Sequence, residues 1–536
     1  MINGFKVITL CGSTRFKKEF LEAQKRLTLE GNVVITVGLF GHSGDDVVWT
    51  EGVKDMLDRQ HLAKIDLADE IFVINVGGYI GDSTRREIAY AEYKGKSITY
   101  LESCRKPSLY DNYAALSELH DAGRISDEDF EKAGCNFDEK RKALIAEYNA
   151  CQGPWPYQWK NIDAVVCGIM QQIGVVSIDY PDLKDLYDCY SVWEIRLSSQ
   201  NKDQRQRVND IINTMQTQYG YILSNAQKLV VTLYYSPNVS SYDDDLSQLQ
   251  DFLTNYVDET NIIWQTRKMS STKDSIEISL LIKHKYDDWV SRVCSFLSEV
   301  GPKLGEKGTH CASFQSKPIL DKQPDIVLLG YNPNEDWEYF KEDSSPKRFY
   351  EGNQSFCNPS ERKKKEWIIW NRLYGSFEWA NYTKPLEDGN FVYFNAVYFG
   401  PKNMKKMKAL PNAQKAIDMC MKFSGEVIQN IFKPKCIICL SVNECFDRLN
   451  EIYKFDNVVS ISTLKETSPD LIDYALNRTD GRNWGYEYNC KMEVKKALWN
   501  GIPVYGIPHT SIRKFNWDDF GAIALYLRSE MQKINI

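Results

Sequence analysis

The chain has 536 residues, a length that suits about three or four domains with separate cores. A net charge of −7, with 43% hydrophobic and 26% charged residues, is typical of globular proteins and argues against non-specific nucleic-acid binding by the whole chain. No apolar run of about 18 residues and no basic N-terminal leader are present, so we expect a cytoplasmic protein without a membrane span. The 14 cysteines lack the spacing of a zinc site, so we expect reduced thiols and neither metal nor cofactor.

The first predicted strand, residues 6–10, leads through the turn Cys-Gly-Ser-Thr-Arg into a helix over residues 16–30. At a helix N-terminus, backbone N–H groups can bind an anion together with the Ser13 hydroxyl and the Arg15 guanidinium. The same turn is also compatible with an ordinary strand-to-helix connection. The glycine-rich loop 38–46, which contains His42, is long enough to close over a ligand.

Residues 70–101 predict a strand, a loop, a helix and a second strand, with Asp82 or Ser83 capping the helix. Ligands of parallel sheets bind beyond the carboxyl ends of the strands. This rule places the loop 77–84 at a binding site, together with Glu87 in the expected first helical turn. A carboxylate there can attack an anomeric carbon or orient a ribose hydroxyl. Alternatively, Glu87 is a first-turn glutamate favoured by the helix dipole.

The run GYIGDSTRREIAYAEYKGK resembles the nucleoside 2-deoxyribosyltransferase family, although Ile88-Ala89 replaces the usual Leu-Gly. The CGSTR turn is similar to the phosphate-binding turn of the related deoxynucleoside 5′-monophosphate N-glycosidases. The resemblance implies a Rossmann-like domain over residues 1–104, in which Glu87 attacks C1′ and forms a glycosyl-enzyme intermediate. It also implies that Asp82 contacts a sugar hydroxyl. The expected nucleotide-binding residues of this domain are Gly12, Ser13, Arg15 and Ser83.

Residues 105–160 predict a helical connector in which Ser126 caps the second helix. Residues 161–300 predict an α+β module. Its order of elements and the loop 177–182 resemble the C-terminal half of FtsZ, which implies a homo-oligomer or an FtsZ-like partner. Nothing resembles the GTP-binding half of FtsZ, so no GTPase activity is implied. A ferredoxin-like spacer is the alternative.

Residues 301–536 predict parallel strands at 325–329, 391–394, 435–440 and 504–506, with a closing helix over 517–532. The polar motifs that follow these strands are GYNPN, Asn395 and His509-Thr510-Ser511, and they resemble the uracil-DNA glycosylase superfamily of the mismatch-specific type. The resemblance implies that Asn332 orients water, that Asn395 hydrogen-bonds the base and that His509 stabilises the leaving group. It also places Ser511 in the nucleotide-binding set.

Two residues depart from the glycosylase pattern, because Asn334 and Thr510 replace a glycine and a proline. Binding of a free base or nucleotide without DNA cleavage therefore stays open. Residues 301–536 carry 33 basic and 29 acidic residues, a net charge of +4 that leaves −11 for the rest. DNA contact is thus expected here if anywhere, through the basic runs 362–365 and 402–408, although such runs are more often solvated surfaces.

Together these patterns predict an α/β multidomain protein with two three-layer parallel-sheet domains on either side of an α+β module. The leading hypothesis is cleavage of the N-glycosidic bond of a nucleotide or nucleoside by the N-terminal domain. The C-terminal domain would sense a base or DNA, as in a phage-defence or conflict effector. The alternatives are a DNA base glycosylase that acts through the C-terminal domain, an NAD hydrolase, and a non-catalytic binding or assembly protein.

Overall fold

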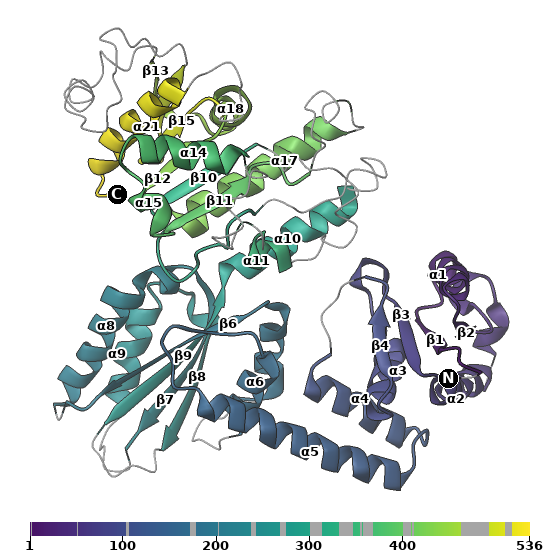
Figure 1. The fold of residues 1–536 in the computed structure, drawn as a ribbon. Coiled ribbons are helices and arrows are strands. Elements are labelled where there is room, and N and C mark those ends of the chain that lie inside the picture. The colour runs from purple at the N-terminus through teal and green to yellow at the C-terminus, as the bar shows by residue number, and fades with distance from the viewer. Residues whose placement is uncertain are drawn as a thin grey trace. The chain divides into compact units, whose positions relative to one another are not determined.

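The structure is a computed structural model, drawn as a ribbon in Figure 1. The chain divides into two compact units, Met1–Arg196 with Val230–Val239 and Ile263–Leu281, and the remaining residues. Within the described part of the chain, no helix is both long and apolar enough to cross a membrane. The described residues are 1, 3–50, 52–102, 107–171, 178–201, 203–236, 243–268, 275–300, 314–331, 347–353, 356, 368–399, 409, 412–461, 493–509 and 517–536.

A four-stranded parallel sheet forms the centre of the N-terminal domain, in the order β2-β1-β3-β4 (Figure 1). In this order the chain runs from β1 to the neighbouring strand β2 on one side and then crosses to β3 on the other side of β1. β1 and β3 therefore flank the switch point where ligands of open α/β sheets bind. The strands are β1 (Val7–Gly12), β2 (Val33–Ile35), β3 (Glu70–Ile74) and β4 (Ser97–Tyr100).

Helices cover both faces of this sheet. Successive strand residues point to opposite sides, so the apolar strands present an apolar surface to the helices on each face. Leu10 and Ile74 pack with Phe20 on the side of α1 (Lys17–Leu29). Cys11 and Val73 instead belong to the core on the side of α2 (Val53–Leu67) and α3 (Asp82–Tyr93). The side chain of Cys11 therefore points toward these two helices at the carboxyl end of β1.

The predicted strand over 70–74 is confirmed, and the predicted start of the next helix is wrong. Helix α3 begins at Asp82 with Gly81 as its N-cap, and neither Asp82 nor Ser83 caps it. Gly81 has an extended backbone (φ −81°, ψ 169°) and no side chain, so no side-chain oxygen accepts a hydrogen bond from the first N–H groups of the helix. Glu87 therefore lies in the second turn of α3 rather than in the first.

The connector contains α4 (Leu109–Asp121) and α5 (Asp127–Ala150). The cap predicted at Ser126 is confirmed, since its Oγ accepts a hydrogen bond from the Asp129 backbone N–H at 3.1 Å. The next sheet has the order β5-β6-β9-β7-β8. Its strands are β5 (Tyr157–Trp159), β6 (Val192–Ser199), β7 (Ala226–Tyr235), β8 (Ile262–Lys268) and β9 (Ile276–His284). The helices of this part are α6 (Ile162–Met170), α7 (Tyr180–Leu183), α8 (Gln204–Ser224), α9 (Asp243–Leu253) and α10 (Lys285–Val300).

A fully buried carboxylate, Glu194, lies in the middle of β6. It accepts hydrogen bonds from Tyr148 Oη at 2.9 Å and Trp159 Nε1 at 2.7 Å. It also accepts from Ser279 Oγ and Arg196 Nε, each at 2.7 Å. Donors from four residues offset the desolvation of this charge, so the interior of the sheet tolerates it.

The C-terminal sheet has the order β11-β10-β12-β15-β14-β13, and its first four strands are parallel. β14 pairs antiparallel with both β15 and β13. The strands are β10 (Ile326–Gly330), β11 (Phe391–Asn395), β12 (Cys436–Cys439), β13 (Asp456–Ile461), β14 (Val494–Trp499) and β15 (Ile502–Gly506).

Both faces of the C-terminal sheet are also covered. Tyr393 belongs to the core shared with α14 (Ile368–Trp379) and α21 (Trp517–Gln532), whereas Phe394 points the other way and contacts Phe432 with ring centroids 6.1 Å apart. The predicted α/β class is therefore confirmed. The remaining helices are α11 (Lys347–Glu351), α15 (Lys384–Glu387), α17 (Ala413–Glu426), α18 (Asp447–Tyr453) and the π-helical turns η8 (Val427–Phe432) and η9 (Val442–Phe446).

Several sequence-based predictions lie outside the described residues. They concern Ser177, Asn332, Asn334, Thr510, Ser511 and the basic runs 362–365 and 402–408.

Candidate functional site

The candidate site begins where β1 and β3 end side by side. Gly12 pairs with Ile74 in the parallel ladder. A Cβ atom on Gly12 would lie 2.8 Å from the Ile74 carbonyl oxygen, and the φ of Gly12 is +152°. The close approach of the two strands therefore requires glycine at this position.

The turn after Gly12 holds the two side chains that the sequence assigned to phosphate. Arg15 Nε donates a hydrogen bond to Ser13 Oγ at 3.1 Å. Its Nη2 donates to Tyr79 Oη at 3.2 Å, and its guanidinium carbon lies 4.3 Å from the centre of the Tyr79 ring. Tyr79 follows the short turn η3 (Val76–Gly78) after β3, so the structure joins the loops of β1 and β3 at Arg15.

The loop after β2 approaches the same turn. The His42 backbone N–H donates to Thr14 Oγ1 at 3.3 Å, and Ser43 Oγ donates to the Thr14 carbonyl at 2.9 Å. The His42 ring lies 4.9 Å from the ring of Trp49, which is 50% exposed. Hydrogen bonds to Thr14 thus bring His42 to the turn, while its imidazole packs on a tryptophan.

Glu87 lies on the inner side of α3, next to residues of β1 and α2. Its Oε2 lies 3.8 Å from His61 Nε2, which in turn lies 3.4 Å from Cys11 Sγ. The Glu87 side chain is 13% exposed, and its buried Oε2 accepts no hydrogen bond from the residues that the structure describes. Among the described residues, the carboxyl forms no ion pair with an arginine or lysine, and a hydrogen bond links it to the Cys11 thiol.

Burial dominates the protonation of this group of side chains. Desolvation raises the pKa of Glu87 to about 8, with a further rise from the nearby charge of Asp58. Desolvation also lowers the pKa of His61 to about 4, and it raises the pKa of the Cys11 thiol well above its ordinary value. At neutral pH all three side chains are therefore predominantly uncharged.

Asp82 and Ser83 lie at the start of α3. The Asp82 carboxylate is 87% exposed and lies 4.0 Å from Arg85 Nη2. Ser83 is partly buried in the same turn. These residues lie beyond the end of β3, as the sequence predicts, and Asp82 faces solvent while Glu87 points inward.

In the C-terminal domain, Asn395 ends β11 and pairs with Gly330 at the end of β10. Asn395 is 4% exposed, and a Cβ on Gly330 would lie 2.3 Å from its Oδ1. His509 follows β15, which β12 separates from β10. Burial lowers the pKa of His509. The structure therefore brings Asn395 to the first residue of the GYNPN motif.

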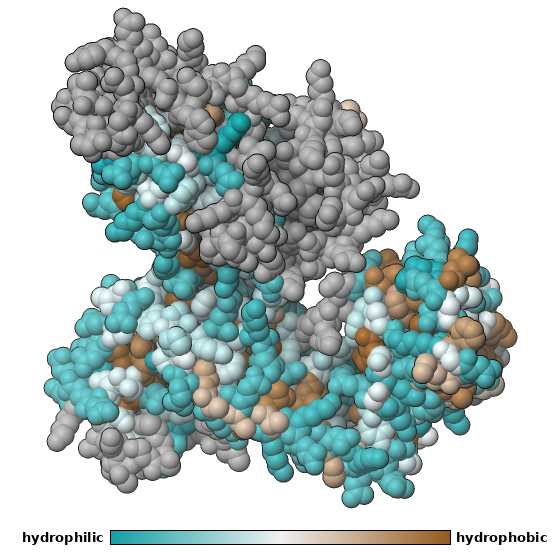
Figure 2. All heavy atoms as spheres, viewed as in Figure 1, coloured by the Kyte–Doolittle hydropathy of each residue, from teal (hydrophilic) through white to brown (hydrophobic). Residues whose placement is uncertain are grey.

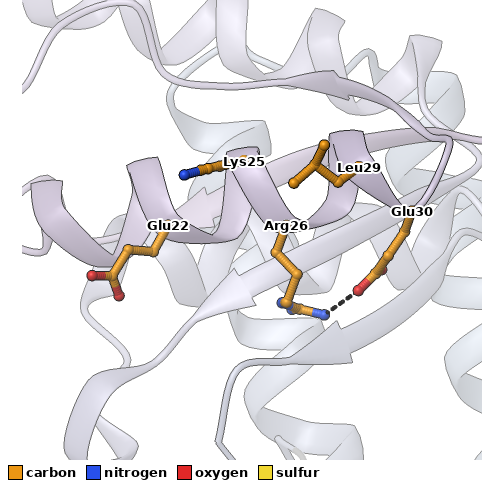
Figure 3. A pocket seen from close by; sticks show the side chains of 5 residues that line it. All are labelled: Glu22, Lys25, Arg26, Leu29 and Glu30. Atoms are coloured by element: carbon orange, nitrogen blue, oxygen red, sulfur yellow. Dashed lines mark hydrogen bonds and ion pairs between the residues drawn. The ribbon is translucent and has the colours of Figure 1, made fainter.

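Two surface features were not part of the predicted site. Figure 3 shows a hollow along α1 that is lined by one segment alone, Glu22, Lys25, Arg26, Leu29 and Glu30. Most exposed large apolar side chains of the described residues belong to the N-terminal domain, where Figure 2 shows hydrophobic surface. Neither feature contains a residue that the sequence assigned to a site.

Neither His61 nor Tyr79 was predicted from the sequence as a site residue, and Cys11 was expected only as part of the turn. His61 is separated from Cys11 by 50 positions, so no local spacing links the two. Tyr79 could have been predicted as a site residue, because it is an aromatic residue inside the glycine-rich loop after β3.

No family model matches this sequence, and no curated protein matches it. Similar solved structures include an empty FtsZ dimer from M. jannaschii, with 10% identity, coverage of 52% of this chain and 88% of that chain, and a TM-score of 0.19. CetZ2 from Haloferax volcanii has 10% identity, coverage of 52% and 92%, and a TM-score of 0.18. TubZ from Bacillus thuringiensis serovar israelensis has 9% identity, coverage of 56% and 94%, and a TM-score of 0.19.

These neighbours include FtsZ, the protein that residues 161–300 were expected to resemble. At such TM-scores the likeness carries no argument about this chain. The comparisons give no support to the deoxyribosyltransferase and uracil-DNA glycosylase resemblances.

Proposed function

We propose that the N-terminal domain cleaves the N-glycosidic bond of a nucleotide or nucleoside, with Glu87 as the nucleophile. The observation that carries this proposal is the buried carboxyl of Glu87 beside the switch point of the sheet, with Oε2 unpartnered among the described residues. A first-turn glutamate stabilised by the helix dipole would face solvent, so that explanation does not account for a buried second-turn carboxyl. Buried groups with a perturbed pKa, set in such a place, are candidates for chemistry.

In the proposed reaction, the ionised carboxylate of Glu87 attacks C1′ of the sugar. The new C1′–O bond forms as the C1′–N bond breaks, and the base leaves with the bonding electrons and takes up a proton. Water or a second base then displaces the carboxylate and regenerates the enzyme. The exposed Asp82 lies on the same helix and is the candidate for the sugar-hydroxyl contact.

The contact between Arg15 and Ser13 supports a preference for 5′-phosphates. The guanidinium and the hydroxyl lie 3.1 Å apart at the loop after β1, so one anion can accept hydrogen bonds from both. The exposed Tyr79 ring beside Arg15 offers an apolar face for a base or sugar.

The test is to incubate the purified protein with deoxynucleoside monophosphates, nucleosides and NAD, with and without DNA, and to follow base release by chromatography. Glu87→Gln should abolish release, and mass spectrometry of denatured wild-type protein should show a sugar adduct on Glu87. Glu22→Gln, on the exposed face of α1, is the matched control and should keep full activity. Release that persists in Glu87→Gln, or no release from any substrate, would overturn the proposal.

A second candidate function is base recognition by the C-terminal domain, favoured by the close approach of Gly330 to Asn395. An amide side chain carries both a donor and an acceptor, the two kinds of group by which an asparagine recognises a base. Asn395→Ala should weaken the binding of free uracil or of uracil-containing DNA, measured by calorimetry, while leaving base release by the N-terminal domain intact. Unchanged binding would argue against this role.

A further inference from the structure

We propose that Cys11, His61 and Glu87 form a binding site for a zinc-class divalent metal ion. We further propose that metal binding prevents Glu87 from acting as a nucleophile. This second part rests on the proposed glycosidase function, whereas the metal site itself does not.

Three ligand atoms of suitable type converge from three different elements. Cys11 Sγ comes from β1, His61 Nε2 from α2 and a carboxylate oxygen of Glu87 from α3, and the three atoms lie within 4.8 Å of one another. Sulfur, imidazole nitrogen and carboxylate oxygen together are the ligands that zinc prefers. Because the side chains project from a strand and two helices, the backbone already holds the ligands near one another.

The separations are close to those of a tetrahedral zinc site. Zinc–ligand bonds of about 2.0–2.3 Å place neighbouring ligand atoms roughly 3.3–3.6 Å apart. The observed values are 3.4 Å from Cys11 Sγ to His61 Nε2 and 3.8 Å from His61 Nε2 to Glu87 Oε2. Small rotations of the side chains therefore suffice to close the site around an ion.

Burial and charge also favour a metal ion here. Cys11 is fully buried, His61 is 6% exposed, and Oε2 of Glu87 has no hydrogen-bond partner among the described residues. Binding would release the protons of the thiol and the carboxyl, as metal ligands must be deprotonated. One thiolate and one carboxylate then neutralise the two charges of the ion, so the buried site carries no net charge.

Coordination by Glu87 would have a direct effect on the proposed reaction. A carboxylate oxygen bound to the metal cannot attack C1′, so we expect zinc to inhibit base release and a chelator to restore it. Three protein ligands leave a fourth position for water, as in metal sites with exchangeable ligands.

The test uses cobalt(II), which replaces zinc and reports a bound thiolate by a charge-transfer band in the near ultraviolet. The chelator-treated protein should bind one equivalent of cobalt with this band, and one equivalent of zinc should displace the cobalt. Cys11→Ser should remove the band, and His61→Gln and Glu87→Gln should each weaken cobalt binding at least tenfold. Cys135→Ser is the matched control, because Cys135 is an exposed free cysteine, and it should leave the band unchanged.

The proposal fails if no band develops, if the band survives Cys11→Ser, or if Cys135→Ser removes it. Should Cys11→Ser fail to fold, X-ray absorption of the zinc-loaded wild type decides instead. One sulfur at about 2.3 Å with nitrogen and oxygen near 2.0 Å supports the site, and oxygen ligands alone refute it. All of these measurements are made without substrate. Their outcome therefore tests the metal site alone and does not depend on whether the glycosidase proposal is correct.

Discussion

Nε2 of His61 lies 3.8 Å from Oε2 of Glu87, at the distance of a long ion pair, yet both side chains are predominantly uncharged at neutral pH. Burial lowers the pKa of His61 to about 4 and raises that of Glu87 to about 8. The distance alone would count this pair as a salt bridge, whereas the lowered pKa of His61 and the raised pKa of Glu87 favour the neutral form of both side chains. Any event that ionises Glu87 therefore changes the electrostatics of the whole site.

The first prediction concerns the pH dependence of base release in chelator-containing buffer. A nucleophilic carboxylate must be ionised, and burial raises the pKa of Glu87 to about 8. The value of kcat/KM should therefore rise with pH and level off above this pKa, with roughly a hundredth of the plateau left two units below it. Initial rates across this range measure the profile. A rate that instead falls as pH passes 8 would assign Glu87 the role of a general acid.

The second prediction concerns selectivity for phosphate. Arg15→Ala should raise KM for a nucleoside 5′-monophosphate roughly 10- to 100-fold, which corresponds to the loss of a hydrogen bond to a charged group, about 1.5–3 kcal/mol. The KM for the matching nucleoside should not change. Lys18→Ala removes the same charge from an exposed position of α1 and serves as the control. Equal effects on nucleotide and nucleoside would show that Arg15 acts on the fold of the loop instead.

The third prediction tests the close approach of β1 and β3. Gly12→Ala should lower the free energy of unfolding by about 1–3 kcal/mol, because its Cβ would lie 2.8 Å from the Ile74 carbonyl and its φ is +152°. Gly38→Ala adds a methyl group where no atom lies within 4 Å, so its effect should be small. Denaturant unfolding compares the two variants. Equal stability of both would show that β1 and β3 can separate locally at little cost.

The fourth prediction concerns the end of β10. Gly330→Ala would place a Cβ 2.3 Å from Asn395 Oδ1 and should destabilise the C-terminal domain by about 1–3 kcal/mol. Combining it with Asn395→Ala removes the atom that clashes, so the double variant should be more stable than the sum of the single effects predicts. A double-mutant cycle from denaturant unfolding measures this coupling. Strict additivity would mean that the Asn395 amide moves aside freely.

The sequence predicts the elements of the fold best where apolar residues keep a simple period. The strand over 70–74 and the helix after it are examples, because one is a continuous buried run and the other places Ile88 on an inner face. The sequence does not predict β6, because Glu194 and Arg196 interrupt its apolar pattern. Only the tertiary donors Tyr148, Trp159 and Ser279 make that carboxylate acceptable inside a sheet.

The candidate site could be predicted only in part, for a related reason. Glu87 could be proposed from the sequence because it follows a strand, a loop and the start of a helix in one continuous segment. Cys11 and His61 reach it through the crossover of the chain from β1 to α2, which leaves no periodic mark in the sequence. The exact start of α3 was also beyond reach, since Gly81 turns the backbone without a capping side chain.

The hydrogen bonds to Glu194 determine how the chain can be cut for study. A fragment that starts at residue 161 would retain this carboxylate but would lose the phenol of Tyr148 and the indole of Trp159. Loss of these two donors from the buried carboxylate should destabilise such a piece. A fragment for study should instead begin at the Ser126 cap, so that it includes the whole of α5 together with β6.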